Sequence, residues 1–276
     1  IRELELGNRK NILQYYRQNS LLGKSILRYA QDFDIVHYNG ENLLGFGNLK
    51  RNTKKPLVTT VHGYFPICIY YTLLTPMNEI CQNPGLTLAC TQCYLHRHKR
   101  RKLLFPAILT AISAELSSRK KGLGLFDKIV CVSKYVEDVT HKVANRKKLV
   151  VVSNMVNLSE ISRALSEGKD FDLREHFQLP SNSRVILYAG RLSPEKGIEV
   201  LISAFRTVRS HVDDCYLIVI GEGRYRSILE RCSEDLNESV FLPGKLPREQ
   251  VLQAMRQSTL FVLPSVWPEP CPTSLI

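Results

Sequence analysis

Short apolar runs alternate with amphipathic segments throughout the second half of the chain. The runs are Val185–Ala189, Tyr216–Ile220, Val240–Leu242 and Leu260–Leu263. Helical patterns fill the intervals over Ile198–Ser210, in a stretch ending near Cys232, and near Arg248–Gln257. Strands that are apolar at every position and alternate with helices are typical of a parallel sheet covered on both faces. The second half is therefore predicted to be a doubly wound α/β domain.

The first half shows the same alternation less regularly. Its candidate strands are Asp34–Tyr38, Leu57–Val61, Lys128–Val132 and Leu149–Val152. A polar segment with charged helical pieces follows them, and its composition is typical of a linker. A length of 276 residues accommodates two domains of about 130 residues each. We predict an N-terminal domain over residues 1–157, a linker over 158–183 and a C-terminal domain over 184–276.

Ligands of open α/β sheets bind beyond the carboxyl ends of the strands. In the second half these ends carry Arg191, Lys196, Gly221, Gly223, Gly244 and Glu269. Two cationic side chains, glycines that admit a close backbone and one carboxylate suit an anion linked to a hydroxylated group. The two glycines around Glu222 are a weak signal alone, because many tight turns after strands need glycine.

The segment Gly190–Gly197 carries the most information. Ser193 is placed to cap a helix that begins with Pro194, a favoured first residue. The N–H groups of that terminus would offer an anion site on which Arg191 and Lys196 close, and this pair suits a diphosphate. The alternative is an ordinary capped helix with two surface cations.

Two further side chains stand where predicted strands end. Glu269 lies in a Pro-rich loop, where its carboxylate can accept hydrogen bonds from sugar hydroxyls beside Trp267. The alternative is an exposed loop glutamate. His62 ends a strand of the first half beside Gly63. The alternative for His62 is a structural hydrogen-bonding histidine, which is commoner than a catalytic one.

The positive charge is concentrated in the first half. Residues 1–150 hold 24 Lys and Arg against 10 Asp and Glu, whereas residues 151–276 hold 14 against 16. The segment 94–121 carries eight basic residues against Glu115, around an apolar centre at Leu103–Leu116. Residues 97–121 therefore suit binding to an anionic membrane surface. The alternative is a helix packed in the protein whose charged ends are solvated, and nucleic acid is a weaker fit. No run approaches the roughly 18 apolar residues of a membrane span, and we expect a cytoplasmic protein, peripheral on the inner face of the membrane.

Four of the eight cysteines lie within one stretch of the first half. They are Cys68, Cys81, Cys90 and Cys93, and the last two form a C-x-x-C pair. Four thiolates so placed could bind structural zinc, although the first two spacings are irregular. The alternatives are no shared role, two disulfides or an iron–sulfur cluster.

Several strings together resemble a known family. The strings are Val185–Gly197, Ile220–Gly223, Phe241–Gly244 and Pro264–Pro270 in the second half, and Asp34–His37, Thr60–Gly63, Val132–Val136 and Val151–Asn154 in the first. They are similar, in this order, to motifs of family 4 retaining glycosyltransferases. The resemblance implies the GT-B fold, two Rossmann-like domains facing across a cleft, of which the first takes the acceptor and the second a nucleotide-sugar donor. It also implies transfer of a sugar from a nucleotide-diphosphate sugar to a glycan or lipid-linked acceptor, with no cofactor or metal required for catalysis.

The resemblance assigns roles to matching positions. Arg191 and Lys196 would bind the donor diphosphate, and Thr273 and Ser274 would lie near its distal phosphate. Gly221 and Gly223 would approach the nucleotide. Glu269 and His62 would contact the transferred sugar. Glu269 matches the first glutamate of the E-x7-E motif of the family. The second would fall one residue past Ile276, and the opening strand of the family is absent, so we expect a fragment of reduced activity.

This chain departs from the family pattern at Ser153–Asn157 and at Pro272. Two other functions stay open on the sequence alone. One is a GT-B nucleotide-sugar epimerase, and the other is a zinc-containing module that binds nucleic acid.

Overall fold

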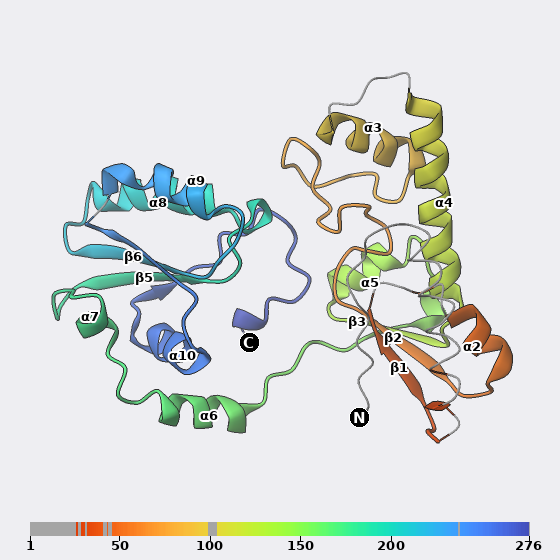
Figure 1. Ribbon diagram of the computed structural model, residues 1–276, viewed down its shortest axis with the longest axis horizontal. Helices are drawn as coiled ribbons and strands as arrows, with labels where there is room; N and C mark the ends of the chain where they lie inside the picture. Colours follow the sequence, from red (N-terminus) through yellow and green to blue (C-terminus); the bar gives the residue numbers. More distant parts are fainter. Residues whose placement is uncertain are drawn as a thin grey trace. The chain divides into compact units, whose positions relative to one another are not determined.

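The computed structural model describes residues 32–40, 46–98, 104–236 and 238–275, together with Ile26, Tyr29, Ala30 and Leu43. The chain divides into two compact units, residues 1–154 and 155–276. Each contains a parallel sheet with helices packed against it (Figure 1). The α/β class predicted from the alternation of strands and helices is therefore confirmed.

The first unit is built on a four-stranded sheet in the order β1-β2-β3-β4. The strands are β1 (Val36–Asn39), β2 (Leu57–Val61), β3 (Lys128–Cys131) and β4 (Leu149–Val151), all parallel. The helices α2 (Phe46–Asn52) and α5 (Lys134–Thr140) follow β1 and β3. The core is formed where Leu57 and Ile129 of the sheet meet Phe46 and Phe126, all of which are fully buried.

Two long helices and a loop extend this unit. Residues 62–86 connect β2 to α3 (Thr87–Arg97), and α4 (Phe105–Gly124) packs beside α3 before the chain enters β3 (Figure 1). Residues 99–103, which include four of the basic residues of the predicted membrane segment, lie outside the described residues.

The second unit has a sheet in the order β7-β6-β5-β8. Its strands are β5 (Arg184–Ala189), β6 (Cys215–Ile220), β7 (Val240–Gly244) and β8 (Leu260–Phe261). Because successive strand residues face opposite sides, Leu217 and Val219 pack under α8 (Ile198–Arg209) and α9 (Arg226–Cys232). Ile218 and Ile220 pack against α7 (Leu173–His176) and α10 (Arg248–Gln257) on the other face. Figure 1 shows these two helices on the side of the sheet opposite α8 and α9.

The segment predicted to be a linker is part of the second unit. It forms α6 (Leu158–Glu167) and α7, and Leu173 is completely buried in the core beneath β5. Gln253 of α10 donates a hydrogen bond to the Leu165 carbonyl at 2.8 Å. The division between the units falls after Asn154. The polar composition of residues 158–183 indicated a linker because only a few apolar side chains anchor these short helices in the core.

Candidate functional site

A cavity of about 870 Å³ lies at the carboxyl ends of β5, β6 and β7 in the second unit. Its polar and backbone lining comes from Gly190, Arg191, Gly221, Glu222, Lys245, Arg248, Thr273 and Ser274, and its apolar lining from Val156, Ile161, Ala189, Ile220, Leu246, Val251, Leu252 and Met255. The volume is within the range of small-molecule sites. The cavity stands at the edge of the sheet where the sequence predicted a ligand.

Gly221 keeps the floor of this cavity open. Its φ of +141° is disfavoured for other residues, and a Cβ there would stand 1.9 Å from the Gly190 carbonyl oxygen. The loops that follow β5 and β6 can therefore lie this close to each other only because residue 221 is glycine. Gly223 does not line the cavity and packs instead against the carbonyl of Leu192.

The charges around the cavity are mostly positive. Arg191, Lys245 and Arg248 contribute guanidinium or ammonium groups, against the one carboxylate of Glu222 in the lining. The Arg191 side chain is 67% exposed, 3.7 Å from the Glu195 carboxylate. The Tyr188 hydroxyl fixes the backbone of Arg191 by donating a hydrogen bond to its carbonyl at 2.9 Å. Such a lining suits an anionic group.

The segment after Arg191 differs from the predicted capped α-helix. Pro194–Lys196 forms a single 3-10 turn, and the Ser193 hydroxyl donates to the Glu195 carboxylate at 2.6 Å instead of capping a backbone N–H. The charged carboxylate of Glu195, two residues on, is a strong acceptor for the hydroxyl proton. The predicted helix start at Ser193 and Pro194 is therefore present as a 3-10 turn without its side-chain cap, and the anion site there stays a prediction.

Lys196 and Glu269 contact each other. The Lys196 ammonium lies 2.6 Å from Glu269 Oε1 and 5.3 Å from the centre of the Trp267 ring, and the Ser265 hydroxyl also donates to this carboxylate. Burial raises the pKa of Glu269, but hydrogen bonds from Lys196, Ser265 and Trp267 outweigh it, so the pKa falls below its ordinary value. Glu269 is therefore ionised near neutral pH. Neither Lys196 nor Glu269 lines the cavity.

Gly197 allows the loops that carry this pair to meet. Its φ is +67°, and a Cβ would stand 1.9 Å from the Pro264 carbonyl oxygen. The Val266 N–H donates to the Glu195 carbonyl at 3.0 Å across the same contact. The segment 190–197 is thereby fixed against the Pro-rich loop 264–270.

The cavity also includes residues that the sequence analysis missed. Lys245 and Leu246 follow β7, and Arg248 and Met255 lie on α10. The signal for Lys245 was available, since it comes directly after a strand that ends at the same edge of the sheet. The apolar residues of α10 gave no signal, because they fit an ordinary packed helix equally well.

His62 lies in the first unit. It follows β2 directly, and its side chain is exposed to solvent. The structure therefore places it at a strand end, as predicted, and its predicted contact with the sugar stays a prediction.

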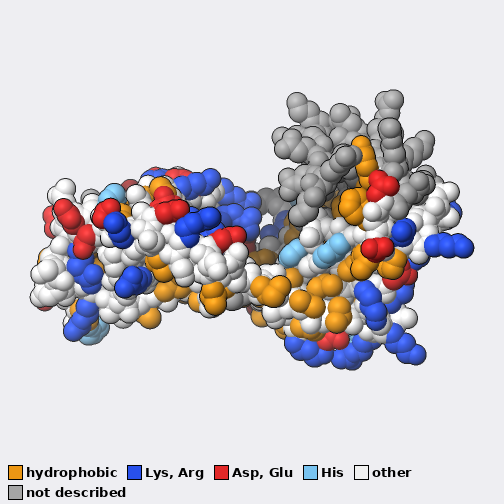
Figure 2. All heavy atoms as spheres, turned by 90° about the horizontal axis from the view of Figure 1, so that it is seen from below, with side chains coloured by type: hydrophobic (Ala, Val, Ile, Leu, Met, Phe, Trp, Pro, Cys, Tyr) orange, Lys and Arg blue, Asp and Glu red, His pale blue; other side chains and the backbone are white. Residues whose placement is uncertain are grey.

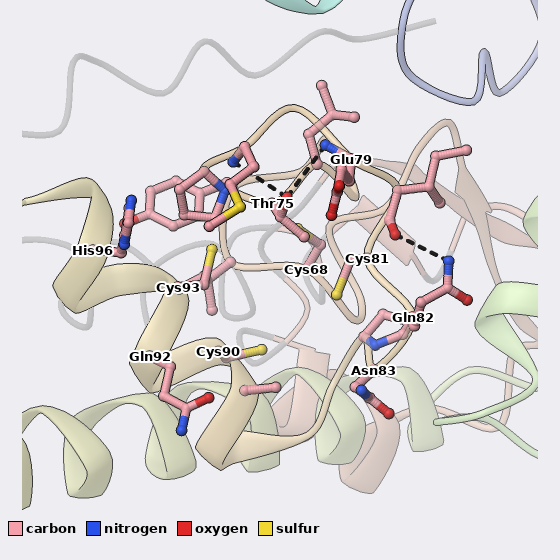
Figure 3. Close-up of a pocket in the computed structure, with 18 of the residues that line it drawn as sticks. Cys68, Thr75, Glu79, Cys81, Gln82, Asn83, Cys90, Gln92, Cys93 and His96 are labelled. Carbon is pink, nitrogen blue, oxygen red and sulfur yellow. Dashed lines mark hydrogen bonds between the residues drawn. The ribbon is translucent and has the colours of Figure 1, made fainter.

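The four clustered cysteines line a second cavity, of about 390 Å³, in the first unit (Figure 3). All four are free thiols. Burial raises the pKa of Cys90 to about 11 and also raises that of Cys93. Among the described residues, no three Cys, His, Asp or Glu side chains already stand in an arrangement that would hold a metal ion.

Comparison with known sequences decides the family. The sequence model described as Glycosyltransferase Family 4 matches residues 2–160, and the one described as Glycosyl transferases group 1 matches residues 169–276. The chain belongs to glycosyltransferase family 4. This membership favours a transferase over the nucleic-acid-binding module.

Two curated relatives show how far the likeness extends. The chain is 22% identical to the uncharacterized glycosyltransferase YqgM of Bacillus subtilis, over 90% of this chain and 56% of that protein. It is 28% identical to a GDP-mannose-dependent monoacylated alpha-(1-6)-phosphatidylinositol monomannoside mannosyltransferase of Corynebacterium glutamicum, over 40% of this chain and 29% of that protein. The chain therefore spans about half the length of YqgM and less than a third of the length of the mannosyltransferase.

Solved structures confirm the GT-B fold. A UDP-forming alpha,alpha-trehalose-phosphate synthase from Burkholderia xenovorans matches with a TM-score of 0.66 at 15% identity, over 92% of this chain and 58% of that one. The Anabaena protein HepE in complex with UDP-glucose matches with a TM-score of 0.58 at 16% identity, over 92% and 59%. Within the described residues, no helix is both long and apolar enough to span a membrane.

Proposed function

We propose that the second unit binds a nucleotide-diphosphate sugar and that the protein transfers its sugar, with retention at the anomeric carbon, to a glycan or lipid-linked acceptor. The observation that carries the proposal is the cavity with three cationic side chains at the carboxyl edge of the sheet. The complex of HepE with UDP-glucose and the GDP-mannose-dependent relative support a nucleotide-sugar donor.

The cavity offers both kinds of surface that such a donor needs. Arg191 and Lys245 are exposed cations that can pair with diphosphate oxygens, and Thr273 and Ser274 add a hydroxyl-bearing turn. Leu246 stands in the apolar part of the lining, which suits the flat face of a base. Charge placed at the diphosphate stabilises the leaving nucleotide as the bond to the sugar breaks.

Glu269 and Lys196 act as a pair in this proposal. An ionised carboxylate accepts hydrogen bonds from sugar hydroxyls, and the Lys196 ammonium keeps Glu269 ionised and in place. Lys196 therefore positions Glu269 here, whereas the sequence analysis assigned it to the diphosphate. His62 is proposed to contact the transferred sugar from the first unit.

The test of the donor site is calorimetric titration of the chain with UDP and with GDP. We expect one of them to bind, and Arg191→Ala to weaken binding by about 1.5–3 kcal/mol, the value for a hydrogen bond to a charged group. The matched control is Arg231→Ala, which removes an exposed arginine of α9 that is not part of the cavity lining. Equal affinity of Arg191→Ala and wild type would refute the assignment.

The acceptor side rests on the first unit. Of the basic residues predicted to face a membrane, Arg97 and Arg119 bind carbonyl groups of the loop after β2, whereas Lys120 and Lys121 are exposed on α4. The described part of the surface that supports a peripheral membrane location is therefore the end of α4.

Product analysis separates transfer from epimerisation, because an epimerase would release a free epimerised sugar nucleotide and glycosylate no acceptor.

A further inference from the structure

The cavity of the first unit collects four thiols that are far apart in sequence. Cys68 and Cys81 come from the loop after β2, while Cys90 and Cys93 stand one turn apart on α3. Residues three apart on a helix share a face, so both thiols of α3 can serve one site. In Figure 3 the side chains of Cys81, Cys90 and Cys93 approach the cavity from the loop on one side and from α3 on the other.

The loop that supplies Cys68 and Cys81 holds unfavourable backbone conformations. It runs for 25 residues between β2 and α3 and pairs through an isolated antiparallel bridge between Leu74 and Ile80. Tyr71 and Leu73 have φ values of 66° and 56°, which bulky side chains rarely adopt. Such conformations persist where the surroundings impose them. Both residues lie between the two loop cysteines.

A small apolar cluster lies beside Cys90, where α3 packs against α4. Its buried members are Cys90, Ile112 and Leu116, with Ile69, Tyr94 and Ile108 packed around them. The loop itself buries Ile67, Leu73 and Leu74 almost completely, so the cavity that the thiols line lies among packed apolar side chains. All four cysteines are free thiols and are therefore available as ligands.

We propose that Cys68, Cys81, Cys90 and Cys93 bind one zinc ion that fastens the loop after β2 to α3. Four thiolates are a standard tetrahedral ligand set of structural zinc. Binding releases the four thiol protons to solvent and changes no oxidation state. The sulfur atoms are not yet arranged as ligands, but rotation about one side-chain torsion moves a cysteine sulfur by about 3 Å.

Two arginines suit the charge of such a site, which would carry a net charge of −2. Arg97 hydrogen-bonds with Cys93, donates to the Leu74 carbonyl at 2.8 Å and stands 4.6 Å from the centre of the Tyr70 ring. Arg119 donates to the Cys68 carbonyl at 3.0 Å. Cationic groups thus lie beside the cysteines on both the α3 and the α4 side.

The first test is metal analysis of the chain purified under reducing conditions without chelator. We expect about one zinc per chain, lost in Cys81→Ser and in Cys90→Ser. Cys131→Ala is the matched control, because Cys131 is a buried cysteine of the same unit that does not line the cavity, and it should retain the metal. Circular dichroism of each variant shows whether it folds.

The second test needs no variant. Titration of the wild-type chain with an organomercurial should release the zinc as four thiols react, and cobalt substitution should give the absorption of tetrahedral cobalt bound by thiolates. Metal-free reduced protein, two disulfides found by mass spectrometry, or iron with acid-labile sulfide would each overturn the proposal. These measurements involve no sugar transfer, so they stand or fall separately from the proposed function.

Discussion

At the residue scale, Glu269 shows how one carboxylate is held from several directions. Lys196 reaches it from 73 residues away in sequence, and Ser265 from four. Lys196 and Glu269 were both predictable as site residues, because each follows a strand at the same edge of the sheet. Their direct contact was not predictable, since the strand-end rule gives a location and says nothing of which charged side chains pair.

Glu269 should give the protein a stability that depends on pH. Its pKa in the folded protein lies below the ordinary value of 4.5, so its stabilising contribution is complete above that value and is lost as the pH falls through the folded pKa. We expect Glu269→Gln to lower the free energy of unfolding by about 1–2 kcal/mol at pH 7. The difference from wild type should shrink below pH 4.5, as measured by urea denaturation across a pH series.

The control for this series is Glu199→Gln, which changes an exposed glutamate of α8. It should leave the free energy of unfolding nearly unchanged at every pH. A difference between wild type and Glu269→Gln that stays constant from pH 7 to pH 3 would contradict the ionic contact.

At the element scale, the strands and the helical pieces of residues 158–183 were predictable, whereas the packing of those pieces into the second unit was not. Each strand in the described residues overlaps a candidate strand of the sequence, and the pattern is clearest in β5 and β6, which are mostly buried and expose almost no polar position that would interrupt it. In α7, by contrast, a single turn is anchored by Leu173 among polar residues. One buried side chain in four residues leaves no periodicity that would indicate this packing.

Gln257 offers a test of how α7 is held. Its side chain accepts from the Leu173 N–H at 2.7 Å and donates to the Phe171 carbonyl at 2.8 Å. Gln257→Ala leaves both groups without these partners, and we expect a loss of about 2 kcal/mol in the free energy of unfolding.

Gln250→Ala on the same helix provides the comparison, because Gln250 takes part in neither of the two hydrogen bonds of Gln257. It should cost well under half as much in urea denaturation. Equal losses for the two variants would mean that residues 158–183 contribute little to the folded second unit, as a linker would.

At the scale of the whole molecule, the unequal distribution of charge was fully readable from the sequence. Figure 2 shows Lys and Arg side chains gathered along an edge of the first unit. What the sequence could not indicate is which cations are used internally, as Arg97 and Arg119 are. The function of the remaining charge is an expectation that vesicle binding can test.

We expect the chain to sediment with anionic vesicles and to leave them as salt rises, since screening shortens to about 8 Å at physiological ionic strength. Lys120→Glu with Lys121→Glu should reduce the bound fraction severalfold. Lys169→Glu with Arg231→Glu makes the same change of charge on exposed residues of the second unit and should have a smaller effect. Equal reduction by the two pairs would contradict a binding surface on α4.

The strand order of the second sheet has a consequence for the newly made chain. β5 pairs with β6 on one side and with β8 on the other, although β8 follows β5 by some 70 residues. During synthesis at about 5–20 residues per second, that side of β5 stays without its partner for roughly 4–14 s. An unpaired strand edge invites association with other chains, so the ribosome-bound intermediate should be a client of chaperones. The cavity of the second unit, which is lined by residues between Val156 and Ser274, forms only after this period ends.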